Sequence, residues 1–215
     1  MGIIEKGMFG AFRKKTGNLV GARWRKVDVI RSVPRKSTKP PTQAQIDQHL
    51  RFALIISFFS RISNLIDAYF GKGDSTPTQM NLAVSYRLKE AVTGVAPDFT
   101  IDYTRIRFSM GNLSLPDNMA ADAVTAGKVD FTWDDDGLDD KRKDATDMVN
   151  VLIYNPTKDK FVIRMKAAPR SAKTYSLQLP PNFSGDSVHT FISFTSVMKK
   201  QLHSRSEYLG LLPVL

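Results

Sequence analysis

The chain has 215 residues, a hydrophobic content of 42% and a charged content of 24%, values typical of a globular protein with its own core. It contains no cysteine, which excludes a disulfide scaffold, a thiolate zinc site and a cysteine nucleophile. The net charge is +10, and residues 1–41 alone carry 11 Lys/Arg against two acidic residues, a net of +9. The basic character therefore belongs to one segment, and the rest of the chain is nearly neutral.

Residues 1–41 are predicted to form an extended arm. Five glycines weaken any helix there, and the sequence KTGN at Lys15–Asn18 is a turn signal. The stretch VDVIR at Val27–Arg31 alternates apolar and polar residues, as a strand does. We therefore expect a basic β-hairpin or a pair of short strands, followed by a proline-rich linker up to residue 41.

The clearest element is a helix that follows Thr42, which forms a capping-box pattern with Gln45. Apolar residues then recur at helical spacing up to Tyr69, about seven turns later. The middle of this helix, Phe52 to Phe59, is apolar on nearly all faces, which indicates burial all round. We expect that a monomer cannot cover it fully, so that Phe52, Ile55, Phe58 and Phe59 contribute to a subunit interface.

A second helix is expected after Thr78, its N-cap, with Gly94 ending it. Beyond Pro97 the period changes to two, which is typical of strands. Six strands are predicted, at Phe99–Ser109, Lys128–Trp133, Met148–Asn155, Lys160–Ala167, Thr174–Leu179 and Val188–Val197. The tail SEYLGLLPVL is expected to add an edge strand or to dock on a neighbour.

The predicted fold class is α+β: an extended basic N-terminal arm, two helices, and an immunoglobulin-like antiparallel β-sandwich. The corresponding segments are 1–41 for the arm, 42–96 for the two helices and 97–215 for the sandwich.

No catalytic or metal-binding pattern is found in the sequence. His49, His189 and His203 have no second ligand at metal-binding spacing, and there is no G-x-S-x-G, P-loop or G-x-G-x-x-G motif. The acidic stretch 130–147 fails as an EF-hand, because Lys143 stands where a bidentate Glu is required. An irregular calcium site is the less favoured reading, and a solvated loop between strands is the preferred one. We therefore expect no enzyme activity, no cofactor and no metal.

The arm has two functional interpretations. Its alternating apolar residues would add strands to a neighbouring subunit. This assembly set is Phe12, Leu19, Val20, Trp24, Val27, Val29 and Ile30. Its basic residues would instead neutralise phosphates of a nucleic acid. This phosphate set is Arg13, Lys14, Lys15, Arg23, Arg25 and Lys26. A merely solvated tail is disfavoured, because it would not need so many apolar side chains.

The chain resembles an uncharacterised protein family common in Bacteroidetes-type bacteria. The resemblance rests on a Gly-Lys-x-Gly type turn at Lys15–Gly17, a Val-Gly step at Val20–Gly21 before Trp24, an Arg-x-x-Pro step at Arg31–Pro34 and the Thr-x-x-Gln helix start at Thr42–Gln45. The later stretches VTGVAPDFTIDYTRIRFSMGNL and SRSEYLG are also similar to that family, so the resemblance covers most of the chain. The glycine that often follows the Trp-Lys step is replaced here by RKV, which makes this chain more basic. The resemblance implies no activity. The proline-rich arm before a Thr-x-x-Gln helix also resembles phage-encoded structural proteins, at the level of analogy only.

From these observations we expect a non-enzymatic structural subunit that self-assembles through its arm and long helix, as in a virion, tail, tube or filament. The alternative is a nucleic-acid-binding protein that uses the basic arm. A third and weaker reading is a sandwich domain that binds a carbohydrate or a protein. The partners expected are further copies of the chain, with nucleic acid as the alternative. We expect no membrane span and no signal peptide, hence synthesis in the cytoplasm and a place in a particle.

Overall fold

The computed structural model describes residues 3–4, 12–24, 27–35, 38–71, 77–134 and 142–215. The chain divides into two compact units, Met1–Gln43 and Ala44–Leu215. The basic segment makes up nearly all of the first unit. The helices and the later strands share the second unit, where they contribute to common hydrophobic cores.

The first unit is a small antiparallel sheet. Its strands are β1 (Ile3–Ile4), β2 (Phe12–Thr16), β3 (Leu19–Trp24) and β4 (Val27–Ser32), paired in chain order. Gly17, with a positive φ of 56°, makes the turn between β2 and β3 that the KTGN pattern predicts. Gly21 lies so close to β2 that an added Cβ would stand 1.8 Å from the carbonyl oxygen of Phe12. The predicted turn thus joins β2 and β3 into a hairpin, and β1 and β4 extend this hairpin on either side.

The helical segment differs from the prediction of one long helix. It forms α1 (Gln43–Ser60) and α2 (Ser63–Tyr69), which are bent by 83° relative to one another. Just before the bend, the hydroxyls of Ser57 and Ser60 donate to carbonyls three residues earlier, an interaction that competes with regular helix bonding. In the described part of the chain no single helix has the length and hydropathy of a membrane span, and α1 and α2 pass that test only when counted together.

Helix α3 (Gln79–Glu90) begins where the sequence predicts. The side chain of Thr78 accepts a hydrogen bond from the backbone N–H of Asn81 at 3.3 Å, which caps the helix. The helix ends earlier than expected, because Val92 already begins a strand.

The described residues of the second unit form three antiparallel sheets. Two short strands, β5 (Val92–Val95) and β6 (Asp98–Ile101), form a hairpin. A three-stranded sheet has the order β11-β8-β7, and a four-stranded sheet has the order β10-β9-β12-β13. Their bounds are β7 Asp117–Asp122, β8 Lys128–Asp134, β9 Met148–Asn155, β10 Lys160–Arg164, β11 Thr174–Gln178, β12 Ser187–Thr195 and β13 Glu207–Pro213.

The observed strands differ from the predicted ones in two places, and the structure settles the role of the C-terminal tail. The stretch Phe99–Ser109 is a strand only at its start and continues as a 3-10 turn at Tyr103–Arg105. Strand β7 was not expected, because its sequence DNMAAD lacks the β-branched and aromatic residues that favour strands. The C-terminal tail forms β13 at the edge of the four-stranded sheet, one of its two expected roles.

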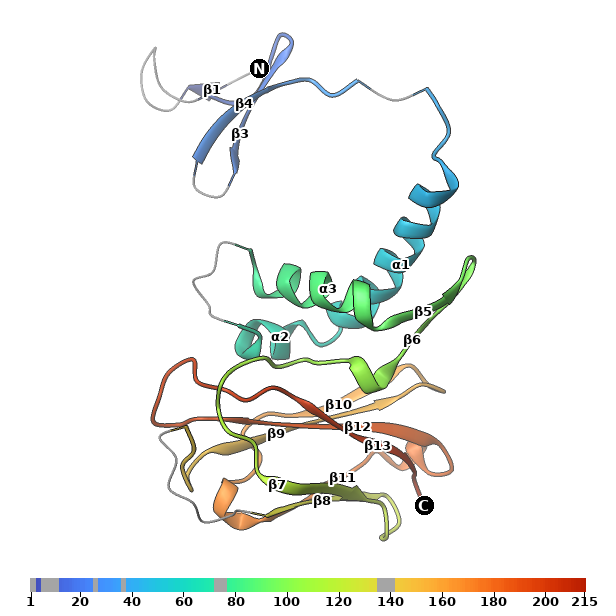
Figure 1. The fold of residues 1–215 in the computed structure, drawn as a ribbon, viewed down its shortest axis with the longest axis vertical. Coiled ribbons are helices and arrows are strands. Elements are labelled where there is room, and N and C mark those ends of the chain that lie inside the picture. The colour runs from blue at the N-terminus through green and yellow to red at the C-terminus, as the bar shows by residue number, and fades with distance from the viewer. Residues whose placement is uncertain (1–2, 5–11, 25–26, 36–37, 72–76, 135–141) are drawn as a thin grey trace. The chain divides into compact units, whose positions relative to one another are not determined.

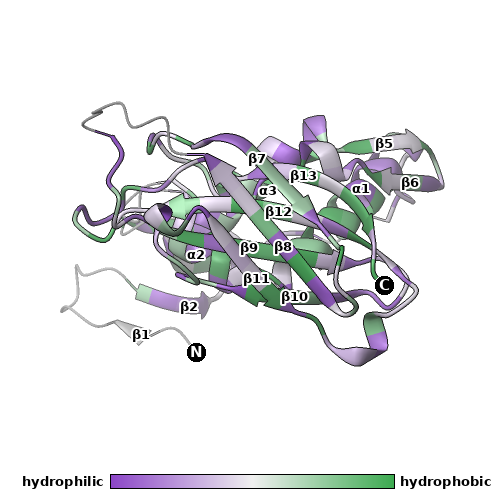
Figure 2. Ribbon diagram, turned by 90° about the horizontal axis from the view of Figure 1, so that it is seen from below, coloured by the Kyte–Doolittle hydropathy of each residue, from purple (hydrophilic) through white to green (hydrophobic). Residues whose placement is uncertain are grey.

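The four-stranded sheet is covered on both faces. Leu152 and Tyr154 of β9 belong to a core shared with the helices, whereas Val149, Val151 and Ile153 belong to a core shared with the three-stranded sheet. Figure 1 shows the helices on one side of this sheet and β7, β8 and β11 on the other. Burial on both faces explains why β9 reads as a nearly continuous apolar run. By contrast β8 alternates hydrophobic and hydrophilic residues, as Figure 2 shows, because only one of its faces meets a core.

A buried ion pair lies beside the core that the four-stranded and three-stranded sheets share. The guanidinium of Arg170 is 3.3 Å from the carboxylate of Asp147 and donates to the carbonyl of Ser114 at 2.8 Å. The indole N–H of Trp133 donates to the Arg170 carbonyl at 2.7 Å. The side chains of Arg170 and Asp147 are 1% and 0% exposed, so neither charge can be hydrated if its partner is lost.

We predict that Arg170→Ala lowers the free energy of unfolding by roughly 3–5 kcal/mol, because it leaves Asp147 buried and uncompensated. Arg164→Ala, at an exposed position on β10, is the matched control and should change it by less than about 0.5 kcal/mol. Urea titration of both variants measures the difference. Equal midpoints for the two variants would show that the buried pair does not stabilise this core.

Candidate functional site

The first candidate surface is one face of the N-terminal sheet. The register places Trp24 opposite Val27, Ala22 opposite Val29 and Val20 opposite Arg31. Alternate residues of a strand share a face, so these three pairs lie on the same side of the sheet. We call this surface, made of Val20, Ala22, Trp24, Val27, Val29 and Arg31, the Trp24 face.

The Trp24 face is exposed at Trp24, Val27 and Arg31, and half-buried at Val20, Ala22 and Val29. Trp24 and Val27 are 59% and 60% exposed, and among the described residues of this unit no helix or second sheet covers them. Two other residues of the predicted assembly set, Leu19 and Ile30, are also exposed, and by the same alternation they lie on the opposite face. Phe12, the remaining one, is half-buried against Gly21.

The predicted phosphate-binding residues surround the same sheet. Arg13, Lys14, Lys15 and Arg23 are all exposed, whereas Arg25 and Lys26 lie outside the described residues. Lys15 pairs with Val20 and so adds a positive charge beside the Trp24 face.

Three of the four residues predicted for a helix interface are buried inside the chain itself. Ile55, Phe58 and Phe59 are buried in the chain's own core, at 0%, 5% and 0% exposure, because α1 packs on the four-stranded sheet. Only Phe52 is left exposed, at 47%. Covering the middle of α1 therefore needs no partner.

Besides Phe52, α1 has other exposed apolar residues that lie nearer its start or on another face. Ile46, Leu50 and Ala53 recur at i, i+4 and i+7, which puts them on one face of the helix, and all three are exposed. We call them the α1 stripe. A hollow of about 430 Å³ adjoins the stripe, and it is lined by Leu50, Ala53, Leu54, Ser57, Pro97 and Phe99.

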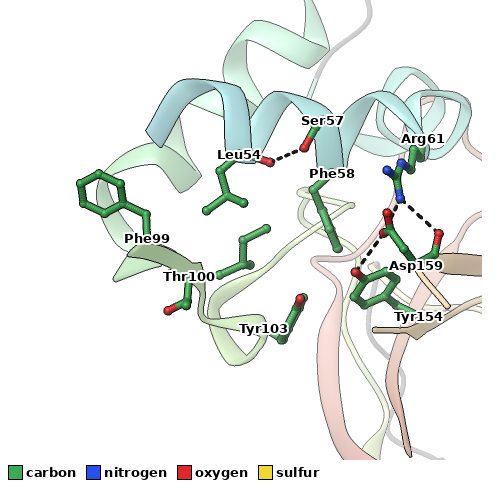
Figure 3. Close-up of a pocket in the computed structure, with 10 residues that line it drawn as sticks. Leu54, Ser57, Phe58, Arg61, Phe99, Thr100, Tyr103, Tyr154 and Asp159 are labelled. Carbon is green, nitrogen blue, oxygen red and sulfur yellow. Dashed lines mark hydrogen bonds and ion pairs between the residues drawn. The ribbon is translucent and has the colours of Figure 1, made fainter. Parts of the chain in front are cut away.

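The second candidate site is a cleft of about 450 Å³ between α1, the β5–β6 hairpin and the turn after β9. Figure 3 shows side chains from these separate segments pointing toward one another. The cleft is lined by Leu54, Ser57, Phe58, Arg61, Phe99, Thr100, Ile101, Tyr103, Tyr154 and Asp159. It shares Leu54, Ser57 and Phe99 with the hollow beside the α1 stripe.

An ion pair closes one end of the cleft. Arg61, at the bend between α1 and α2, pairs with the carboxylate of Asp159 and also donates to its carbonyl oxygen at 3.1 Å. The hydroxyl of Tyr154 donates to the same carboxylate at 3.1 Å. The hydrogen bond from Arg61 holds the pKa of Asp159 below its ordinary value, so the carboxylate stays ionised. Arg61 and Asp159 therefore cancel in net charge.

Aromatic rings form the base and one wall of the cleft. Phe58 meets Tyr154 edge-on at 5.1 Å between centroids, and Tyr154 stacks on Phe161 at 4.6 Å. Tyr103 packs against the ring of His189 at 4.0 Å. Burial raises the pKa of both Tyr103 and Tyr154, so the two phenols remain neutral.

The histidines do not form a metal site. Among the described residues there is no group of three or more His, Cys, Asp or Glu that could hold a metal ion. His189 hydrogen-bonds the Tyr208 hydroxyl through Nδ1 at 2.9 Å, and His203 is buried beside Tyr69. Much of the acidic stretch tested as a calcium loop, residues 135–141, lies outside the described residues.

The chain belongs to DUF6266, a family of unknown function, whose model matches residues 11–210. The match covers most of the first unit and nearly all of the second, so the Gly-Lys-x-Gly arm and the later strands are parts of one family architecture. The comparison with curated proteins found no match.

We predict that stability falls as the pH drops below about 6.5, because burial lowers the pKa of both His189 and His203 from that ordinary value. Below that pH the histidines of the unfolded chain bind protons more readily than those of the folded chain. The stability that comes from keeping both imidazoles neutral is therefore complete above pH about 6.5, and it is lost as the pH falls toward the lowered pKa values of the folded chain. Urea titrations across this range measure the slope.

His189→Gln and His203→Gln should each flatten this slope, whereas the exposed His49→Gln should leave it unchanged. A slope that responds equally to all three substitutions would show that burial of the two histidines is not its cause.

Proposed function

We propose that this protein is a non-enzymatic structural subunit that assembles head to tail, the N-terminal sheet of one copy packing on α1 of the next. The observation that carries this proposal is the exposed Trp24 face. Burying a side chain such as Val is worth roughly 1.5–3 kcal/mol, against at most about 1 kcal/mol for an exposed charge pair. A small sheet on its own is marginally stable unless its apolar face packs on something.

The α1 stripe is the receiving surface that fits best. It is the outward apolar face of a helix, and a helix packed on a sheet is one of the standard layer arrangements of proteins. The hollow beside it, about 430 Å³ and lined by Leu50, Ala53, Pro97 and Phe99, has room for the indole of Trp24. Because the two surfaces differ, such contacts are heterologous and generate a ring or an open filament. A virion, tail, tube or filament component is the class of protein that this implies.

The strand orders support an immunoglobulin-like sandwich as the scaffold. Lettered in chain order, β7, β8 and β11 take the places of strands A, B and E, and β9, β10, β12 and β13 those of C, C′, F and G. The two sheets share one core, which includes the buried Trp133. In this reading the helices are an addition on the outer face of the C′CFG sheet.

Binding of nucleic acid by the arm is the second candidate. It is favoured by Arg13, Lys14, Lys15, Arg23 and Arg31, which are exposed on the same small sheet as Trp24. Basic residues beside an aromatic ring are typical of surfaces that bind single strands by phosphate contact and base stacking.

Two variants of the full chain test the head-to-tail proposal. Trp24→Ser with Val27→Ser removes the sheet surface, and Leu50→Lys with Ala53→Lys removes the stripe. All four positions are exposed, so both variants should stay folded. We predict that each variant alone sediments as a monomer, and that a mixture of the two forms a one-to-one dimer and nothing larger, since only one intact pair of surfaces remains.

The control replaces Arg13, Lys14, Lys15 and Arg23 with Gln and should leave assembly intact but less sensitive to salt. A wild-type chain that is monomeric at every concentration would overturn the proposal. So would unimpaired assembly of the Leu50/Ala53 variant, which would point to sheet-to-sheet contacts. Tight, salt-dependent binding of nucleic acid that the Gln variant loses would favour the alternative.

A further inference from the structure

We propose that the cleft between α1, the β5–β6 hairpin and the turn after β9 binds a neutral sugar residue of a glycan chain. The cleft adjoins the hollow that would receive Trp24 and shares Leu54, Ser57 and Phe99 with it, but the inference is argued from the cleft alone. It follows from three features of the cleft: its size, its aromatic walls and its neutral polar end.

The size fits one or two sugar rings. A volume of about 450 Å³ lies within the range of small-molecule sites and is much too small for a folded segment of a partner. Several of its lining residues, Ser57 and Thr100 among them, are exposed, so a ring within the cleft can continue into a longer chain.

The aromatic walls are held firmly from outside the cleft. Tyr103 packs against His189, and the guanidinium of Arg51 lies over the ring of Phe99 at 4.7 Å from its centroid. Neither His189 nor Arg51 is among the residues that line the cleft, so these contacts do not fill it. Tyr103 is half-buried and lines the cleft, and its ring suits the apolar C–H face of a pyranose. Phe99 lies at the outer end of the cleft, with its ring directed away from Tyr103 (Figure 3).

The polar end of the cleft selects against other ligands. Its charged side chains, Arg61 and Asp159, neutralise each other, so an anion such as a phosphate gains little there. Their side chains are 44% and 53% exposed, and a purely apolar ligand would strip water from both without replacing its hydrogen bonds.

An uncharged ligand with two neighbouring hydroxyls can replace the hydrogen bonds that water makes to Arg61 and Asp159. One hydroxyl can donate to the carboxylate of Asp159 while its neighbour accepts from Arg61, because a hydroxyl both donates and accepts. The hydroxyls of Ser57 and Thr100 are already bonded within the chain, to the carbonyl of Leu54 and to the hydroxyl of Thr93, so Arg61 and Asp159 carry the polar recognition. Neutral sugars combine such hydroxyl pairs with an apolar ring face.

Isothermal titration of the full chain with four neutral probes tests this assignment: cellohexaose, xylohexaose, mannohexaose and chitohexaose, with trigalacturonate as the anionic comparison. At least one neutral probe should bind saturably, and more tightly than trigalacturonate. Asp159→Asn should weaken that binding by about tenfold, since a hydrogen bond to a charged group is lost. Tyr103→Leu should weaken it by a similar factor.

Asp98→Asn is the matched control, because Asp98 is an exposed carboxylate on the same hairpin that does not line the cleft. Thermal unfolding of every variant separates loss of binding from loss of the fold. Failure of all four neutral probes would overturn the assignment. Unchanged binding in folded Asp159→Asn and Tyr103→Leu, or preference for trigalacturonate, would do the same.

Discussion

The second unit depends on the burial of both faces of its four-stranded sheet. Strand β9 lies at the centre of this arrangement, with Leu152 facing the helices and Val151 facing the three-stranded sheet. The bend between α1 and α2 belongs to the same arrangement, because it lets Ile55, Phe59 and Leu65 all reach one core. It also places Arg61 at the corner of the helices, within reach of Asp159, so the cleft follows from the way the sheet is covered.

The first unit lacks such cover among its described residues. Its sheet is as small as the β7–β8–β11 sheet, yet Trp24 and Val27 are mostly exposed, whereas Trp133 and Phe131 of β8 are buried. A tryptophan on a small sheet is thus exposed to solvent in the first unit and buried in the second. In the proposed assembly, the gain would come from burying the apolar surface that Trp24 and Val27 expose.

Much of the fold could be predicted from the sequence, and the failures have physical causes. The N-cap at Thr78, the alternation along β8 and the edge position of β13 all follow from local patterns. The bend at residues 61–62 could not be predicted, because the apolar spacing continues through it without interruption. The burial of Phe58 and Phe59 in the chain's own core could not be predicted either, because the sequence does not say how many elements pack on one helix.

The cleft shows a further limit. Arg61, Tyr103, Tyr154 and Asp159 come from separate parts of the chain, and the site exists only once the helices and the hairpin have packed on the sheet. Tyr154 lies near the end of β9, Asp159 in the turn after it and Arg61 just after α1, so no local pattern marks them as a group. A search of the sequence for motifs can therefore single out the apolar residues of the arm, which are close in sequence, but not this cleft.

The measurement that tests the central claim most directly is acrylamide quenching of tryptophan fluorescence across a range of protein concentrations. The chain has two tryptophans, and Trp133 is 1% exposed, so the quenchable emission reports Trp24 alone. If the Trp24 face packs on another copy, the quenchable fraction falls as concentration rises, with the same midpoint as the increase in native mass. A quenchable fraction that stays constant while the native mass rises would contradict the account, because assembly would then leave the Trp24 face exposed.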